Sequence, residues 1–442
     1  MKFFLSRCYK YLERIGYFSF LTGIFFLCSS LLIGALFLLP ALIVGGILQS
    51  KENNFFKDKW NCSFFLCGIL ILINGLLQKF ILTNNLKGVW SSDLTILGMA
   101  NWIPFFWLFW TFQPFLNSPK KRKQFVKCII AGTFPLLISG FGQYFFNWTG
   151  PLETLNNLII WYQKPIISPG GLSGLFSNQN YAGTWLNFVW PFCLALIFEK
   201  SHNIIKKGFS ICFLISISLA TFLTFSRNAW AGLLVALPIV IGQESLIWIT
   251  PFFVIGTMVF IFYLSNSFSN EISDFLRNLI PDKLLMEFTE EGYEGLDATR
   301  LEILKSALKI STIRPLVGIG AASFSAIYFL ETSFYKGHSH NLITELAISY
   351  GIPVAIIFLI SIILLLVKSA HIIFFKNLEF SKNQFIDRAF WSSSFFFFLS
   401  QLADIQYFDG KISIVAWSLL AALKNITDEN KNNIINIQKN AI

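Results

Sequence analysis

The sequence predicts an all-α polytopic membrane protein. Of its 442 residues, 55% are hydrophobic, 17% aromatic and only 13% charged, whereas about a quarter of the residues in a typical soluble domain are charged. The apolar residues recur in runs of about twenty, the length at which a helix spans the hydrocarbon layer of a bilayer. A water-soluble globular protein is therefore excluded. The net charge of +10 has to be understood from where the charges lie along the chain.

The first apolar run, residues 17–49, fits either one tilted helix or a hairpin of two short helices that turns near Gly34. Lys and Arg favour the cytoplasmic side of a membrane. The basic N-terminus and the basic cluster 120–123 then lie on the same side, which requires an even number of crossings between them. Two further runs, 62–82 and 97–116, lie in this interval. We therefore expect the first run to be a hairpin.

The same counting extends to the C-terminus. Further apolar runs cover about residues 125–146, 178–198, 208–225, 228–242, 246–265, 342–367, 389–403 and 411–424. The basic segments 200–207 and 368–388 and the tail after Lys424 then fall in the cytoplasm. The sequence predicts about twelve transmembrane helices, both termini in the cytoplasm, and one long periplasmic loop, residues 266–340. A central unit, 174–370, is flanked by N-terminal helices (1–173) and by C-terminal helices with a cytoplasmic tail (371–442).

The outer loop differs from the rest of the chain in its charge. Residues 267–337 contain 7 Lys and Arg against 10 Asp and Glu, so the positive charge lies elsewhere, mostly in the cytoplasmic segments. The net charge is therefore an orientation signal, and nucleic acid is not an expected partner. Within the loop, residues 299–311 predict an amphipathic helix, because apolar residues recur at helical spacing. Arg314-Pro315 should end it, and Gly318 and Gly320 should allow a tight turn.

Two histidines are placed for chemistry at the outer face. His202 and His371 lie beside lysines in predicted cytoplasmic loops, whereas His338 and His340 lie where the outer loop re-enters the membrane. Two histidines at this spacing, with no Cys or carboxylate nearby in the sequence, make a poor metal site, and we predict none. Ser339 or Asn341 is expected to cap the following helix and so to hold His340 at the interface.

An arginine and two asparagines are further candidates. Arg227 lies between two apolar runs on the predicted outer side, where the charge bias disfavours it. An arginine at such a position is costly unless it is solvated or paired, and its planar guanidinium suits a phosphate ligand. Asn178 and Asn180 stand at the outer start of a predicted helix, where they could bind sugar hydroxyls, although capping of the helix is favoured.

Four segments carry a family resemblance. They are GLFSNQNYAGTWLNFVWPF (174–192), TFSRNAWAGLLV (224–235), ATRLEILKSALKISTIRPLVGIGAASF (298–324) and GHSHNLITELAISYGI (337–352). In this order, and with an outer loop between them, they resemble the O-antigen ligase and O-antigen polymerase superfamily over about residues 174–370.

The resemblance implies a glycosyltransferase of the inner membrane that needs no metal or other cofactor. Its donor would be a glycan linked to undecaprenyl diphosphate, and its acceptor a lipid core or another glycan. By resemblance, Arg227 and Arg300 bind the diphosphate, and His340 activates or orients the acceptor hydroxyl, with His338 and Asn341 as supports. These roles suit the residue types, since guanidinium groups stabilise a leaving diphosphate and an imidazole accepts a proton near neutral pH.

Three classes of function remain open at this stage. A glycan transferase could be a ligase or a polymerase, which share these motifs. A solute transporter, such as a bicarbonate carrier of the same superfamily, should show ionisable groups near the middle of the membrane. The apolar runs contain few, and Asp404 and Asp409 lie at a predicted outer turn. A structural scaffold gives no reason for Arg227, Arg300 and His340 to share one face.

Overall fold

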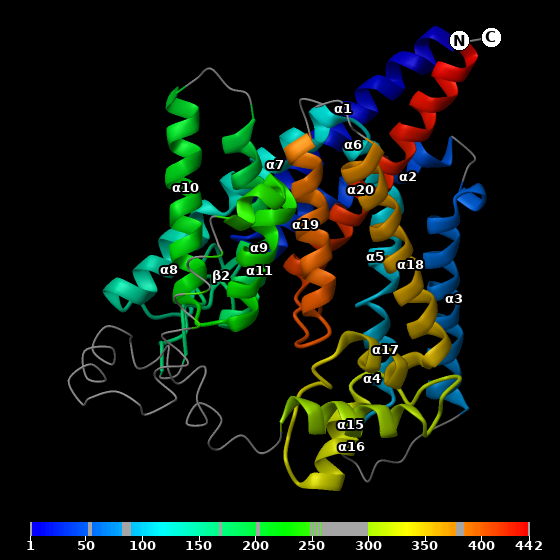
Figure 1. Cartoon of the computed structure of the whole chain (residues 1–442). Helices are drawn as coiled ribbons and strands as arrows, with labels where there is room; N and C mark the ends of the chain where they lie inside the picture. Colours follow the sequence, from blue (N-terminus) through cyan, green and yellow to red (C-terminus); the bar gives the residue numbers. More distant parts are fainter. Residues whose placement is uncertain are drawn as a thin grey trace.

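The computed structural model describes residues 2–51, 55–81, 90–167, 170–199, 204–247, 299–376 and 384–440, with the single positions 250, 254 and 257. This part of the chain is almost entirely helical (Figure 1). Its elements are α1 (Lys2–Leu27), α2 (Leu31–Ser50), η1 (Phe55–Lys57), α3 (Lys59–Phe80), α4 (Asp93–Met99), α5 (Ile103–Thr111), α6 (Gln113–Leu116), α7 (Pro119–Gly132), α8 (Phe134–Phe146), β1 (Leu152–Thr154), β2 (Ile159–Trp161), α9 (Gln179–Phe198), α10 (Ile204–Leu223), α11 (Arg227–Ile241), η2 (Gln243–Ser245), α15 (Arg300–Ser311), α16 (Ser323–Thr332), α17 (Leu342–Tyr350), α18 (Ile352–Ala370), η4 (His371–Lys376), α19 (Gln384–Ser400) and α20 (Gly410–Asn440).

The described residues form an α-helical membrane protein. Six helical segments are long and apolar enough to cross a bilayer: 31–50, 59–80, 93–111, 119–146, 179–198 and 352–375. Two shorter apolar helices, 207–223 and 227–241, accompany them. The count of about twelve crossings stays a prediction. The predicted run 246–265 falls mainly outside the described residues, as do the acidic first half of the outer loop and His202.

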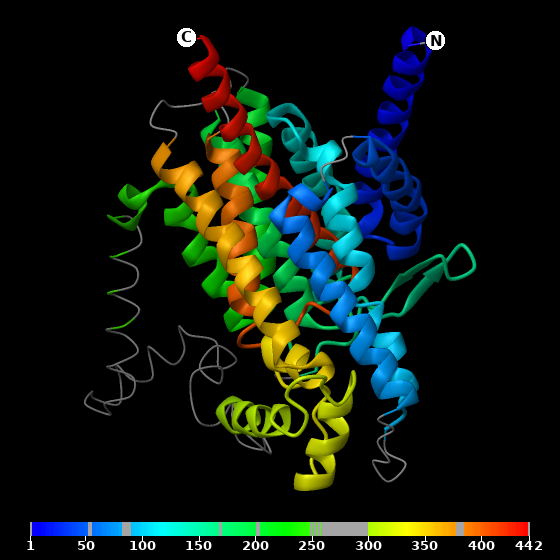
Figure 2. The same cartoon turned by 90° about the vertical axis from the view of Figure 1, so that its right-hand side faces the viewer.

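The two termini lie at one end of the molecule, and α15 and α16 lie at the opposite end (Figures 1 and 2). The predicted topology requires this arrangement, because it puts both termini in the cytoplasm and α15 in the outer loop. We refer below to the termini end and the α15 end.

The first apolar run is a hairpin, as predicted, but it turns earlier than expected. α1 ends at Leu27 and α2 begins after Ser30, whose side-chain oxygen accepts a hydrogen bond from the Ile33 amide at 3.3 Å and so caps the helix. Gly34 lies inside α2, where an added Cβ would come within 3.0 Å of the Leu27 Cα. This glycine therefore allows the two helices to pack closely and does not make the turn.

Two predicted membrane runs are each divided into two helices. The run 125–146 changes from α7 to α8 at Thr133, just before Pro135. The run 342–367 breaks at Gly351, which has a φ of +97° and would bring a Cβ within 2.3 Å of the Leu316 carbonyl oxygen. Buried amides of α3 satisfy the carbonyls at the C-terminal end of α17: Asn74 Nδ2 donates to Tyr350 O at 2.7 Å. α17 is consequently a short separate helix whose N-terminus belongs to the site described below.

The basic cluster at the start of α7 is largely engaged in ion pairs. Arg122 is fully buried, with Nε 3.1 Å from Asp387 Oδ1 and Nη1 2.6 Å from Glu429 Oε1. These pairs join α7 to α19 and α20. Lys121 pairs with Glu13 at 2.7 Å. The basic residues 120–123, which indicated the orientation of the chain in the membrane, thus also hold helices together at the termini end.

One β-hairpin departs from the all-α prediction. Strands β1 and β2 pair antiparallel and contact the turn between α1 and α2. The indole of Trp161 donates to Ser29 O at 3.0 Å, and Ser30 Oγ donates to Leu158 O at 2.7 Å.

Candidate functional site

Four separate segments meet near Asp404. They are the first residue of α15 (Arg300), the segment before α17 (His340), the loop between α19 and α20 (Asp404) and the first turn of α9 (Asn180). We call these four residues the Asp404 cluster. The cluster lies at the α15 end of the molecule.

α15 presents Arg300 from a helix with a fixed start. Thr299 and Glu302 form a capping box: Thr299 Oγ1 accepts from the Glu302 amide at 3.3 Å, and Glu302 Oε2 accepts from the Thr299 amide at 2.8 Å. Ile303, Ala307 and Ile310 bury one face against the neighbouring segments 319–328 and 348. The predicted amphipathic helix is therefore confirmed, and it holds Arg300 on its first turn.

The segment before α17 is held by hydrogen bonds on both sides. Asn341 caps the helix, accepting from the amides of Ile343 and Thr344 at 3.0 and 3.1 Å. Its Nδ2 donates to Leu402 O at 3.0 Å, and the Leu342 amide donates to Gln401 O at 2.9 Å. The cap predicted at Ser339 or Asn341 is thus at Asn341. Asn341 therefore uses its Oδ1 to cap α17 and its Nδ2 to hold the loop that carries Asp404.

The carboxylate of Asp404 accepts four hydrogen bonds. At Oδ1 the donors are His340 Nδ1 at 2.7 Å and Arg300 Nη1 at 3.1 Å. At Oδ2 they are Asn180 Nδ2 at 3.0 Å and Gln406 Nε2 at 2.9 Å. Gln406 is itself held by Gln401, which donates to its Oε1 at 3.0 Å. Asp404 therefore organises the cluster, and a second layer of amides orients Asp404.

The contacts of His340 Nδ1 favour one tautomer of the neutral imidazole. Arg300 Nη1 carries two hydrogens and has three neighbours, namely Ala403 O, Asp404 Oδ1 and His340 Nδ1, the last at 2.9 Å. If the two hydrogens go to the oxygens, His340 Nδ1 must carry its own hydrogen and donate it to Asp404. The reverse assignment would set a lone pair of Nδ1 against a carboxylate oxygen at 2.7 Å. The favoured tautomer leaves Nε2 of His340 with a lone pair that can accept a proton.

The charges around Asp404 favour its ionised form. Burial alone would raise the pKa of this carboxyl group, but the hydrogen bond from His340 and the positive charge of Arg300 outweigh burial, and the pKa lies well below its ordinary value. Asp404 is therefore an anion at neutral pH. The Arg300 side chain is 54% exposed and that of His340 25%, so both are reachable from solvent.

His338 supports His340 as a neutral group. Its Nδ1 accepts a hydrogen bond from the His340 backbone amide at 3.2 Å, and the two rings meet edge to face with centroids 4.5 Å apart. Burial lowers the pKa of His338 to about 4, and repulsion from His340 adds to this effect. His340 itself has a φ of +55°, a left-handed conformation that is uncommon for residues other than glycine. The support from His338 helps to hold this conformation.

The cluster has the composition of a metal site but is engaged with a guanidinium group. His338, His340 and Asp404 offer ligand atoms within 4.8 Å of one another. Arg300 Nη1 lies 2.9 Å from His340 Nδ1 and 3.1 Å from Asp404 Oδ1, so a cation could bind these atoms only if it displaced the guanidinium. These contacts fit an arginine-bound carboxylate better than a cation site.

The other predicted site residues lie nearby with different contacts. Asn178 is the N-cap of α9, and its Oδ1 accepts from the Asn180 amide at 2.7 Å. Arg227 is the exposed first residue of α11, which crosses α9 closely, since a Cβ on Gly183 would lie 2.6 Å from that of Ala229. The start of α11 is thus at the same end as the cluster. Arg227 takes no part in the hydrogen bonds that the described residues make around Asp404.

Asp404 is the site residue that the sequence analysis missed. The topology had placed it at an outer turn, and it is one of few carboxylates beside an apolar run on the outer side. That position was the available signal. Nothing in the local sequence joins it to His340, 64 residues away, or to Asn180, 224 residues away.

The fold and this site define a polytopic helical membrane protein with an arginine–histidine–carboxylate cluster at one end. Residues 211–359 match the family model described as O-antigen ligase. The resemblance read from the sequence is confirmed over this segment, which includes Arg227, Arg300 and His340 and stops short of Asp404. No curated protein matches the chain. The family supports glycan ligation or polymerisation, a glycosyltransferase type of reaction, as the general activity.

Proposed function

We propose that the protein transfers a glycan from a polyprenyl diphosphate, such as undecaprenyl diphosphate, to an acceptor sugar at the outer face of the inner membrane. The acceptor is a lipid core or another glycan. The observation that carries this proposal is the contact of His340 and Arg300 with one oxygen of Asp404, within 2.7 and 3.1 Å, at the end of a membrane protein whose central segment matches a ligase family.

In this proposal His340 acts as the general base. Its Nδ1–H is held by Asp404, so that Nε2 accepts the proton of the acceptor hydroxyl. The acceptor oxygen then forms a bond to the anomeric carbon of the donor, and the bond from that carbon to the diphosphate oxygen breaks. The leaving diphosphate takes the electron pair. Asp404 stabilises the imidazolium that forms, as the carboxylate does in a Ser-His-Asp triad.

The arginines act on the leaving group. Arg300 makes its hydrogen bonds to described residues through Nη1, which leaves its Nε and Nη2 for phosphate oxygens. A guanidinium is suited to this role because it donates two parallel hydrogen bonds to one phosphate. Arg227, on the neighbouring α11, is proposed as the second cation. No step in this scheme needs a metal ion.

The test is a comparison of alanine variants in cells that depend on this gene product for surface polysaccharide. We expect His340→Ala, Arg300→Ala and Arg227→Ala each to reduce transfer by about 10²–10⁴-fold, the range typical for loss of a catalytic acid, base or charge-stabilising group. His371→Ala, at the termini end, is the control and should leave the glycan unchanged. Membrane abundance of each variant is measured on immunoblots. Normal glycan in all three site variants would refute the proposal.

A gel of surface polysaccharide from a strain in which the gene is deleted distinguishes a ligase from a polymerase. Deletion of a ligase leaves bare lipid core, with finished chains on the carrier lipid. Deletion of a polymerase leaves core that carries a single repeat unit. An unchanged gel with altered uptake of bicarbonate would indicate a transporter, and would contradict the transferase proposal.

A further inference from the structure

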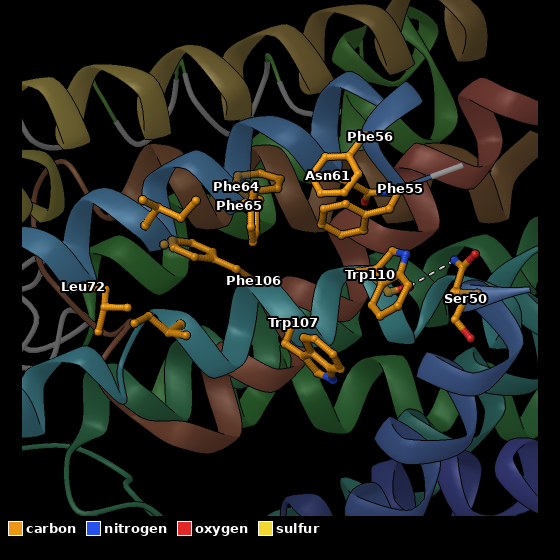
Figure 3. Close-up of a pocket in the computed structure, with 14 residues that line it drawn as sticks. Ser50, Phe55, Phe56, Asn61, Phe64, Phe65, Leu72, Phe106, Trp107 and Trp110 are labelled. Carbon is orange, nitrogen blue, oxygen red and sulfur yellow. Dashed lines mark hydrogen bonds between the residues drawn. The ribbon is translucent and has the colours of Figure 1, made fainter. Parts of the chain in front are cut away.

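An aromatic groove lies between α2, α3 and α5, towards the termini end of the molecule. Its volume is about 550 Å³. Figure 3 shows Phe55 and Trp110 at one end of it, beside Asn61, and Leu72 at the other, with Phe106 and Trp107 between them. The lining is almost wholly apolar, and its polar members, Gln49, Ser50 and Asn61, gather at the Phe55 end.

The length of the groove matches one leaflet of a bilayer. Along α3 it runs from Asn61 to Leu72, a distance of about 17 Å at the rise of an α-helix. A leaflet contributes about half of the ~30 Å hydrocarbon core. Because α3 continues beyond Leu72 to reach α17 through Asn74 and Gln78, the groove lies in the leaflet at the termini end, away from the Asp404 cluster.

The groove faces lipid. Its walls belong to segments that are long and apolar enough to cross the membrane, and large side chains along it remain exposed in the monomer, including Trp107 at 55%. In a membrane such surface is covered by hydrocarbon. An open apolar groove of this size is filled by a flexible chain that can lie along it, since unfilled space forfeits dispersion contacts on both sides.

The polar end of the groove carries positive charge. Lys51 follows the last residue of α2, Lys57 lies in η1, and Lys59 is the first residue of α3, all of them exposed. Asp58, between them, caps α3 and pairs with Lys424 at 3.2 Å, so its charge is compensated within the protein. Glu52 lies outside the described residues. Lysines at the level of the lipid headgroups attract anionic lipids.

We propose that this groove binds one acyl chain of an anionic phospholipid of the leaflet at the termini end, with the lipid phosphate among Lys51, Lys57 and Lys59. The site is separate from the Asp404 cluster, and the proposal does not depend on glycan transfer. The lipid would pack α2, α3 and α5 together at the place where protein side chains leave the space unfilled.

The experiment blocks the groove without disturbing the backbone. Gly68 lines it, and a Cβ there would meet only a Phe106 ring atom at 3.5 Å, an ordinary contact. Gly68→Leu therefore places its side chain in the groove. Gly208→Leu is the matched control, because a Cβ at Gly208, on α10, has nothing within 4 Å. Full-length protein is purified in a mild detergent, and bound phospholipid is measured by native mass spectrometry with added phosphatidylglycerol or phosphatidylcholine of the same acyl chains.

We expect the wild type to retain one molecule of phosphatidylglycerol more than Gly68→Leu does, because the leucine fills the groove. Gly208→Leu should retain as much as the wild type. A second variant, Lys57→Gln/Lys59→Gln, leaves the groove intact and should weaken the preference for phosphatidylglycerol over phosphatidylcholine by about fivefold per lysine. Equal retention by all proteins, equal binding of both lipids by the wild type, or a bound mass that matches a polyprenyl phosphate would each overturn the assignment. So would a dimer that dissociates only in Gly68→Leu, since the groove would then be a protein interface.

Discussion

Replacement of Asp404 by asparagine separates its charge from its shape. The four donors around the carboxylate, on His340, Arg300, Asn180 and Gln406, are 2.7 to 3.1 Å from its oxygens. An asparagine accepts hydrogen bonds only at its oxygen, and its NH₂ group would face two donors. The two donors on the side of the NH₂ group therefore lose their acceptor, whichever way the amide is turned.

The expected effect on transfer is large because one orientation of the new amide also reverses the tautomer of His340. If the NH₂ group of the new residue faces Nδ1, the imidazole accepts there and carries its hydrogen on Nε2, which can then no longer act as a base. The same substitution in a Ser-His-Asp triad lowers the rate by about 10⁴-fold. The asparagine in Asp404→Asn can turn its oxygen towards His340 instead, so we expect a loss of about 10²–10⁴-fold.

The assay measures surface glycan at matched membrane abundance, with Asp409→Asn as the control from the same loop. Asp409 caps α20, accepting from the amides of Lys411 and Ile412 at 2.9 and 3.2 Å. Asparagine caps helices as well as aspartate does, so this variant should retain wild-type glycan. Wild-type activity in Asp404→Asn would refute the role of the carboxylate. Equal losses in both variants would show that the loop tolerates no change, and would leave no specific role for Asp404.

Three further predictions concern the neighbours of Asp404. Arg300→Lys should lose about 10²–10³-fold in transfer at normal membrane abundance, because a single ammonium group cannot hold Asp404 and also bind phosphate through separate nitrogens; wild-type transfer rates would contradict this. In the folded protein the pKa of His338 is lowered from 6.5 to about 4. As the pH falls, the unfolded chain therefore takes up a proton at this histidine before the folded chain does. The free energy of unfolding should then decrease between about pH 6.5 and pH 4, by at most about 3 kcal/mol. His338→Gln should flatten this part of a pH–stability curve measured by thermal unfolding, and an unchanged slope would contradict the assignment. Thr299→Ala should weaken the start of α15 by about 1 kcal/mol, seen as hydrogen exchange about fivefold faster in its first turn and unchanged in α18.

The sequence predicted the features of the fold that depend on local pattern. Apolar runs located most of the helices, charge counting predicted the first hairpin, and helical spacing predicted α15. The same spacing left two apolar faces on α15, and the structure buries Ile303, Ala307 and Ile310 while Leu301 and Leu308 remain exposed. The segments that pack against the helix decide which of the two faces is buried. The hydropathy of the helix itself does not identify these segments. The break at Gly351 was missed for a similar reason, because that glycine is required by its contact with the Leu316 carbonyl.

The sequence predicted the residue types of the candidate site but not all of the residues that contact them. Arg300 and His340 were selected for their chemistry and their side of the membrane, and the structure brings them together across 40 residues of sequence. Their common partner, Asp404, lies in a third segment, and only the tertiary fold brings the three together. Arg227 was selected by the same criteria, and its part in the reaction stays a prediction.

In the proposed reaction, the charge of the cluster changes in step with the charge of the leaving group. The proposed scheme starts with His340 unprotonated and with the charges of Arg300 and Asp404 compensating each other, so the cluster attracts a diphosphate only through Nε and Nη2 of Arg300 and through Arg227. When His340 accepts the proton of the acceptor, the cluster gains one positive charge at the moment at which the diphosphate gains negative charge. A group that is charged mainly in the transition state favours it over the bound substrate. Asp404 makes this possible, because it stabilises the imidazolium without adding a fixed positive charge that would retain the product diphosphate.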